Sequence, residues 1–136
     1  MSFAAVLPDT DTEFAPSITV SGEMSPDAAT LADLANKSVE RLHEVAESVV
    51  VALRREVGSI DAPVLAQRLV FSAVIDGIHR DLVQSQVYLS LPDVRDPHNR
   101  AAIQLVLTAT AAQHHSVLGD FQEFVRTIRT GSEAGT

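Results

Sequence analysis

The first clear pattern of apolar positions begins near residue 25 and has a helical period. Ser25-Pro26-Asp27 combines a capping side chain, a proline at the first helical position and an acidic first turn, which is a typical helix start. Apolar or small residues then recur at alternating steps of four and three: Leu31, Ala35, Ser38, Leu42, Val45, Val49 and Ala52. This spacing places them on one face of a helix. The pattern predicts a first long helix over residues 25–58, ending at Gly58.

Two further helices are predicted after this one, with prolines between them. Apolar residues over 61–91 are assigned to one helix, which Pro92 must end because proline has no N–H and clashes with the preceding turn. Asp96-Pro97 is a second start signal, and no proline follows it. The last helix is therefore predicted over 97–130. The two helices would form a C-terminal helical hairpin over 61–131 that turns across Pro92–Pro97.

The first 24 residues have no apolar period. They contain Pro8, Pro16 and Gly22 among scattered acidic and hydroxyl residues. Such composition predicts a disordered acidic tail, with at most a short strand at Ile18-Thr19-Val20. The alternative is a tail with a task, such as a secretion signal or a partner-binding strand. The predicted fold class is all-α: a disordered N-terminal tail, then long helices, the last two forming the hairpin.

Composition narrows the classes of function. The net charge of −8 argues against a nucleic-acid partner, whose phosphates need a basic surface. Five Phe, one Tyr and no Trp predict a thin aliphatic core rather than an enzyme built around a pocket. Without cysteine, neither a disulfide nor a thiolate site can form. The longest apolar runs, such as Val49–Leu53, have five residues and are too short to span a bilayer, and the N-terminus lacks the basic residue of a cleavable signal peptide.

Two carboxylate-x-x-His turns are the strongest candidates for metal chemistry. Glu40-Arg41-Leu42-His43 lies on the first predicted helix and Asp76-Gly77-Ile78-His79 on the second. Facing turns of this kind form half of a carboxylate-bridged di-iron site, but the other inward carboxylates are missing, so solvated helix faces are the favoured interpretation. His114-His115 point about 100° apart on a helix and cannot chelate one ion together. No Gly-x-Ser-x-Gly elbow is present. We therefore expect no enzyme, metal or cofactor.

One family resemblance rests on the last third of the chain. Asp96-Pro97 opens the last predicted helix, Gln104 and Leu107 follow, and Gln113 comes six residues later. From Asp96 onward the chain resembles the C-terminal region of type III secretion inner-rod proteins, of the rhizobial or plant-associated type, which are similar to needle subunits. The predicted hairpin also resembles the needle-type helical hairpin.

The resemblance implies a non-enzymatic structural subunit of a protein-export conduit. Copies would pass unfolded through the export gate and stack into a homo-oligomer that contacts export-gate and needle proteins, with no small-molecule substrate. The protein would lie in the bacterial cell envelope within a secretion apparatus, or be exported, with the cytoplasm as the alternative. The residues expected to make subunit contacts are Val117, Phe121, Phe124, Ile128, Gln104, Leu107, Gln113, Asp96 and Pro97.

Two other classes of protein stay open. The first is an acidic helical export chaperone or regulatory adaptor that acts as a soluble dimer. The second is a helical bundle that binds a metal or ligand. Val117, Phe121, Phe124 and Ile128 step by four, three and four, so they form one apolar stripe on the last predicted helix. The packing of this stripe distinguishes a protein that folds alone from a subunit that assembles. In a protein that folds alone the stripe packs within one molecule, and in a rod subunit part of it faces neighbouring copies.

Overall fold

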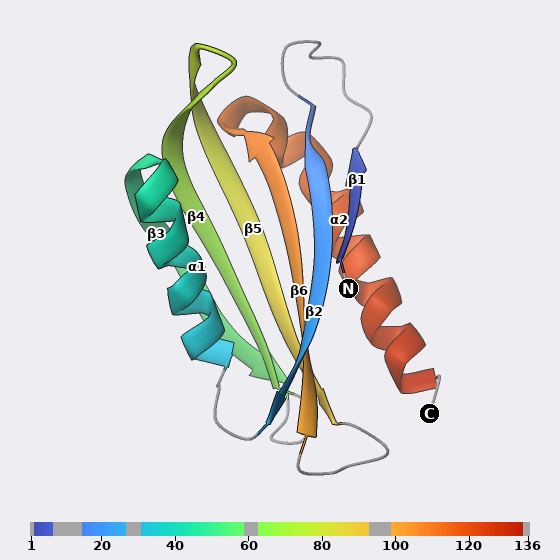
Figure 1. Cartoon of the computed structure of the whole chain (residues 1–136). Coiled ribbons are helices and arrows are strands. Elements are labelled where there is room, and N and C mark those ends of the chain that lie inside the picture. Colours follow the sequence, from blue (N-terminus) through green and yellow to red (C-terminus); the bar gives the residue numbers. More distant parts are fainter. Residues whose placement is uncertain (1, 7–14, 27–30, 59–62, 93–98, 135–136) are drawn as a thin grey trace.

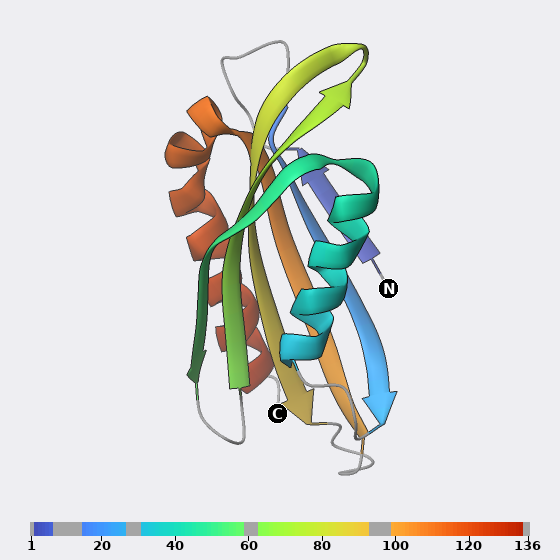
Figure 2. The same cartoon turned by 90° about the vertical axis from the view of Figure 1, so that its left-hand side faces the viewer.

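The chain forms a strongly curved, antiparallel six-stranded sheet with one helix on each face (Figures 1 and 2). The structure is a computed structural model that describes residues 2–6, 15–26, 31–58, 63–92 and 99–134. The elements are β1 (Ser2–Val6), β2 (Ser17–Pro26), α1 (Leu31–Val45), β3 (Glu47–Gly58), β4 (Pro63–Ile75), β5 (Ile78–Pro92), β6 (Asn99–Thr110) and α2 (Ala111–Ala134).

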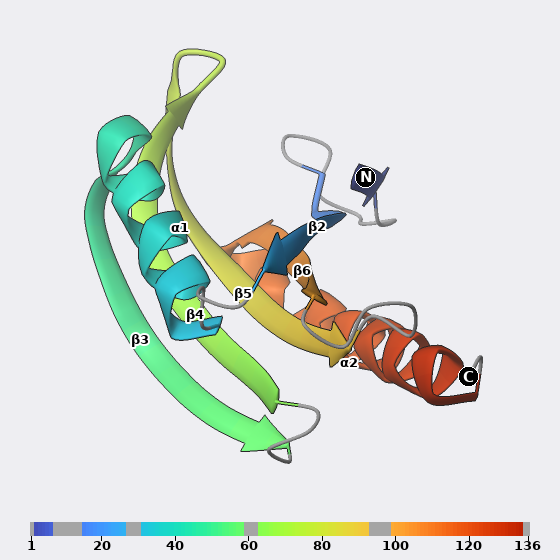
Figure 3. The same cartoon turned by 60° about the horizontal axis from the view of Figure 1, so that its bottom comes forward.

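The strand order is β1-β2-β6-β5-β4-β3. Strands β3 to β6 follow one another as a meander, and β2 then pairs with β6, so Ile18 lies opposite Leu107 although they are far apart in the sequence. Between β2 and β3 the chain crosses the sheet through α1, which packs inside the concave face against β3, β4 and β5 (Figure 3). Helix α2 packs on the other, convex face against β5 and β6.

The all-α prediction is wrong, and residues 61–91 show why most clearly. This region forms β4 and β5, joined at Asp76-Gly77, where both residues have positive φ, 53° and 78°. Asp-Gly between β-branched residues is the sequence of a two-residue hairpin turn, whose central positions both require positive φ. The prediction had placed this glycine inside a helix. The numerous β-branched residues of β4 and β5 pack well on a pleated surface, so tertiary pairing prevails over the partial helical period.

The predicted first helix is also too long, and the tail prediction is wrong for its described part. Helix α1 covers Leu31–Val45, and Val49-Val50-Val51 that follow it belong to strand β3. A short apolar run fits either a helix or a strand, and three consecutive β-branched residues favour the strand. In the tail, the suggested short strand at Ile18-Thr19-Val20 is part of the longer β2, and Ser2–Val6 pairs with it as β1.

The last helix begins at Ala111 rather than at Pro97, and Asn99–Thr110 forms strand β6. Its start is fixed by a capping box: the Thr110 backbone N–H donates to Gln113 Oε1 at 3.1 Å, and the Gln113 N–H donates to Thr110 Oγ1 at 3.2 Å. The chain does reverse after Pro92, but between antiparallel strands. Asp96 and Pro97 lie outside the described residues. The helical hairpin behind the inner-rod resemblance is thus replaced by a β-hairpin, and the inner-rod function stays an untested prediction.

Successive side chains of β4, β5 and β6 point to opposite faces of the sheet, so the apolar core is divided between the two faces. The convex-face core under α2 consists of Ile18, Val64, Leu89, Leu105, Leu107, Ala109, Val117 and Phe121. On the concave face, α1 covers Leu65 and Tyr88 near its start and Leu69, Phe71 and Leu82 near its end. Both helices therefore hold the sheet through separate apolar clusters. Neither helix, over its described residues, has the length and apolar character needed to cross a membrane.

Strand β3 forms one edge of the sheet and pairs irregularly with β4. The register shifts between Glu47 and Val50 and again between Val51 and Leu53, and Ser48 has a φ of 56°. Several of its apolar side chains remain exposed, among them Val50 at 57%. Helix α2 does not extend over this edge, so the convex face of β3 is open (Figure 2).

Phe121 is the main contact that attaches α2 to the sheet, because its side chain is 2% exposed within the convex-face core. We expect Phe121→Ala to lower the free energy of unfolding by about 3–5 kcal/mol, through lost burial and the cavity left behind. Urea unfolding followed by far-UV circular dichroism measures this change. Val74→Thr, at a side chain that is 66% exposed, is the control and should stay within about 0.5 kcal/mol of wild type. A Phe121→Ala variant as stable as the control would contradict the packing of α2.

Candidate binding groove on the concave face

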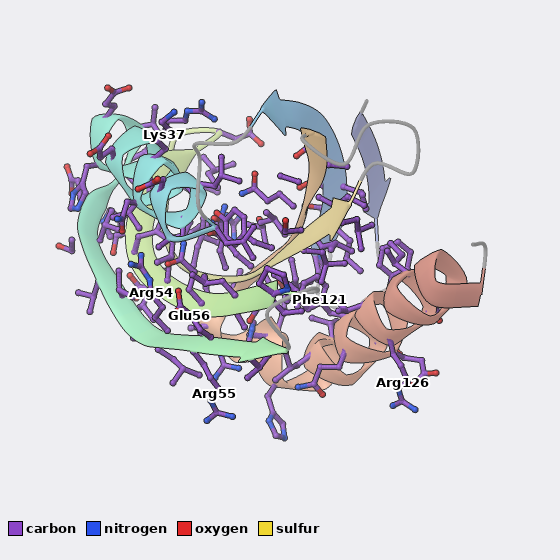
Figure 4. The ribbon with its side chains drawn as sticks, turned by 90° about the horizontal axis from the view of Figure 1, so that it is seen from below. Lys37, Arg54, Arg55, Glu56, Phe121 and Arg126 are labelled. Carbon is purple, nitrogen blue, oxygen red and sulfur yellow. The ribbon has the colours of Figure 1, made fainter. Side chains whose placement is uncertain are left out.

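A groove runs along the part of the concave face that α1 leaves open. Two adjoining hollows form it, with volumes of about 200 and 340 Å³, and they share Ser21, Ser38, Arg41 and Gln104. Helix α1 forms one wall and β2 the other, while β5 and β6 form the floor (Figures 1 and 4). The groove therefore lies between elements that the chain brings together only through the β2–β6 pairing.

The floor follows alternate residues of β6. Ala102, Gln104, Val106 and Thr108 all line it, because every second side chain of a strand points to the same face. At about 3.4 Å per residue, the distance from Ala102 to Thr108 is roughly 20 Å. The groove is thus an elongated site rather than a closed cavity.

Beneath α1, the floor is held by a network of buried amides. Gln67 on β4 lies directly opposite Gln86 on β5, and Gln67 Nε2 donates to Gln86 Oε1 at 2.7 Å. The Tyr88 hydroxyl donates to the same oxygen at 2.8 Å. Gln67 and Gln86 are only 2% and 1% exposed, so these bonds replace the water that the amides lose on burial.

The same network reaches α1 and the open floor. Gln86 Nε2 donates to Ser38 Oγ on α1 at 3.0 Å and to Gln84 Oε1 at 2.8 Å. Gln104 Nε2 donates to the Tyr88 hydroxyl at 3.0 Å, which brings a groove-lining amide into the network. Burial raises the pKa of Tyr88, an effect partly offset by the neighbouring polar side chains of Ser38 and Gln67 and by nearby arginines. The hydroxyl therefore remains a neutral donor and acceptor.

Two cations on α1 face the groove, whereas its described lining contains no acidic side chain. Lys37 and Arg41 are both exposed and line the wall. Neither forms an ion pair within the described ranges. Arg54, by contrast, is fixed on the β3 side by Gln67 Oε1 at 2.7 Å and Asn36 Oδ1 at 2.8 Å. The groove thus combines amides and hydroxyls with two cations that are available to a ligand.

The two carboxylate-x-x-His turns do not come together. Glu40 and His43 are exposed on α1, while Asp76 and His79 belong to the β4–β5 hairpin. Among the described residues, no group of three His, Asp or Glu side chains is placed to hold a metal ion.

Ser85 and His114 form a close pair of polar side chains on the convex face that the helical pattern did not predict. Ser85 Oγ lies 2.7 Å from His114 Nε2, and both side chains are buried between β5 and α2. His115 is exposed, as expected for neighbours on a helix. Burial lowers the pKa of His114, and the charges of Arg68 and His115 lower it further. The signal that could have found this pair is the strand alternation of β5, which was assigned to a helix.

The residues predicted for subunit contacts occupy three different places. Val117 and Phe121 are buried against the sheet of their own chain, with Phe124 and Ile128 packed beside them. This is the packing expected of a protein that folds alone. Leu107 lies in the same core, Gln113 caps α2, and Gln104 lines the groove. A role for any of them between copies remains a prediction.

Comparisons with known proteins show the fold and no family. No family model matches the chain, and no curated protein matches it either. Among solved structures, PA94 from Pseudomonas aeruginosa, a protein of unknown function described as a candidate regulator, is similar, with a TM-score of 0.65 at 20% identity over 93% of this chain and 81% of that one. LpqN of Mycobacterium tuberculosis, involved in cell envelope biogenesis, gives 0.57 at 12% identity over 88% and 73%.

The buried His114 predicts a specific loss of stability in acid. Because its pKa is lower in the folded chain than the ordinary 6.5, the unfolded chain binds more protons between those two values. Stability should therefore fall as the pH drops below about 6.5 and stop falling, for this group, below the folded-state pKa. We expect urea unfolding between pH 7.5 and 5 to show a smaller pH-dependent loss for His114→Gln than for wild type. His43→Gln, at an exposed histidine on α1 and on the opposite face of the sheet, is the control and should retain the wild-type slope. Equal slopes in all three proteins would contradict the assignment.

Proposed function

We propose that the protein is a non-enzymatic binding protein, an adaptor or export chaperone, that holds a short acidic segment of a partner polypeptide in the concave groove. The observation that carries the proposal is the pair of cations, Lys37 and Arg41, which form no ion pair with any described residue and lie above a floor that includes amides and hydroxyls. Carboxylates would contact the cations, while backbone amides of the partner would meet Gln104, Gln84 and Thr108.

The dimensions of the groove support a segment rather than a single small molecule. A floor of roughly 20 Å accommodates about six residues of extended chain at about 3.4 Å each. The groove is open to solvent and is bounded by α1 and β2. A partner could therefore enter from the side without unfolding the protein.

Charge supports an acidic partner. The whole chain has a net charge of −8, so an acidic segment would be repelled by most of its surface. Lys37 and Arg41 make the wall of the groove positive, in contrast to the net negative charge of the chain, and this local charge would direct the acidic segment to the groove. The architecture also supplies a rigid platform, since the amide network joins the floor to α1 through Ser38 and the Ala35 carbonyl.

The test uses six- to eight-residue peptides selected from a displayed random library on the full chain. We expect the selected peptides to be rich in Asp and Glu and to bind more weakly as salt is added. The double change Lys37→Gln with Arg41→Gln should weaken binding about two- to thirtyfold, since each of the two exposed charge pairs contributes about 0.2–1 kcal/mol. Fluorescence anisotropy of a labelled peptide measures the affinity.

Charge-matched controls locate the site. Arg55→Gln and Arg126→Gln remove the same charge from β3 and from α2, away from the groove, so peptide binding should be unchanged (Figure 4). Selection of apolar or basic peptides, or equal weakening by all of these changes, would exclude the proposed groove.

A further inference from the structure

The convex face contains a separate hollow that is not part of the groove. It lies where α2 leaves β3, β4 and β5 uncovered, and its volume is about 170 Å³. The lining residues that matter here are Leu53, Arg55, Arg68, Val87, Leu118 and Phe121. The side chains named below all project from the convex side of the sheet or from α2. We refer to this hollow as the α2 cleft.

Two arginines from neighbouring strands meet in the α2 cleft. Arg68 lies opposite Leu53 in the β3–β4 register, and Arg55 lies opposite Ala66, so the two arginines are diagonal neighbours on one face. Figure 4 shows Arg55 directed outward from β3, while Arg54 and Glu56 lie on the inner side. Neither Arg55 nor Arg68 pairs with an acid in the part of the chain that the structure describes.

Ser85 and His114 orient the inner arginine. Arg68 Nε donates to Ser85 Oγ at 3.4 Å, and Ser85 Oγ hydrogen-bonds to His114 Nε2 at 2.7 Å. This contact uses one of the five N–H donors of the guanidinium. The two Nη atoms of Arg68 have no hydrogen-bond partner among the described residues, so their donors can serve a bound anion.

The other side of the α2 cleft is apolar. Leu118 and Phe121 from α2 face Leu53 and Val87 from the sheet across the hollow. Leu53 is 44% exposed, and Val57, two residues further along β3, is 43% exposed. A ligand that satisfies both sides must carry one compact anionic group and an aliphatic part beside it.

We propose that the α2 cleft binds an aliphatic monocarboxylate of medium chain length. The carboxylate contacts Arg55 and the free Nη donors of Arg68, since a guanidinium matches the planar geometry of a carboxylate. The alkyl chain lies along Leu118 and Leu53 and covers apolar surface that α2 leaves exposed. This site is on the opposite face of the sheet from the peptide groove and does not depend on it.

Octanoate is the probe, titrated into the full chain by isothermal titration calorimetry. We expect saturable binding of one octanoate, at least tenfold weaker binding of 1-octanol, which lacks the charge, and at least tenfold weaker binding of acetate, which lacks the chain. Arg68→Gln should weaken octanoate binding about tenfold or more, as expected for hydrogen bonds to a charged group. Arg55→Gln, at an exposed position, should weaken it up to about fivefold. Arg126→Gln, on the exposed part of α2 beside Glu123, is the charge-matched control and should bind as wild type.

Several results would overturn the proposal. These are no octanoate binding to wild type, octanol binding as tight as octanoate, or equal affinity in Arg55→Gln and Arg126→Gln. Arg55 is exposed, so its variant tests the site even if Arg68→Gln, at a partly buried position, melts early. The proposal would also be wrong if the wild type sedimented as a dimer through this face and did not bind octanoate. In that case a second copy of the chain, rather than a carboxylate, would occupy the α2 cleft. The double change Lys37→Gln with Arg41→Gln should leave octanoate binding unchanged. The test of the α2 cleft is therefore independent of the test of peptide binding in the groove.

Discussion

The opposed pair Gln67 and Gln86 determines how α1 lies on the sheet. Both amides are buried on the concave face, and a buried amide without partners would cost about 1–3 kcal/mol. Their partners include the Ala35 carbonyl and Ser38 Oγ on α1, and Tyr88 within the sheet. The helix is therefore tied to one position along β4 and β5 by polar contacts, while its apolar residues supply the attraction. Because α1 stays on the β3 side, the floor over β6 and β2 remains open.

The two faces of β5 divide the chemistry of the molecule. Gln84, Gln86 and Tyr88 point to the concave face, whereas Ser85, Val87 and Leu89 point to the convex face. One face thus offers an extended floor with several amides and hydroxyls, suited to a polypeptide segment, and the other offers a small hollow between an apolar wall and two arginines. A single strand can support both because its side chains alternate between faces.

Local sequence signals predicted part of this fold. The stretches that became α1 and the described body of α2 were correctly assigned to helices, and the chain reversal after Pro92 was correctly placed. Two local signals were available but not used: Asp76-Gly77 as a hairpin turn, and Thr110 with Gln113 as a capping box. The pairing of β2 with β6 has no local signal, because it joins residues as distant as Ile18 and Leu107. The groove and the Ser85–His114 pair both depend on strand register, so treating β4 to β6 as helices concealed them, although Gln104 had been singled out for another reason.

The irregular pairing of β3 has a consequence for the behaviour of the protein at high concentration. An edge strand of 12 residues with exposed valines would ordinarily template the addition of further strands. Two register shifts and the left-handed backbone at Ser48 interrupt its row of hydrogen-bonding groups, so an incoming strand cannot keep one register along the whole edge. The same irregularity that shifts the β3–β4 register on both sides of Val50 and Val51 therefore opposes edge-to-edge growth of the sheet from one copy to the next.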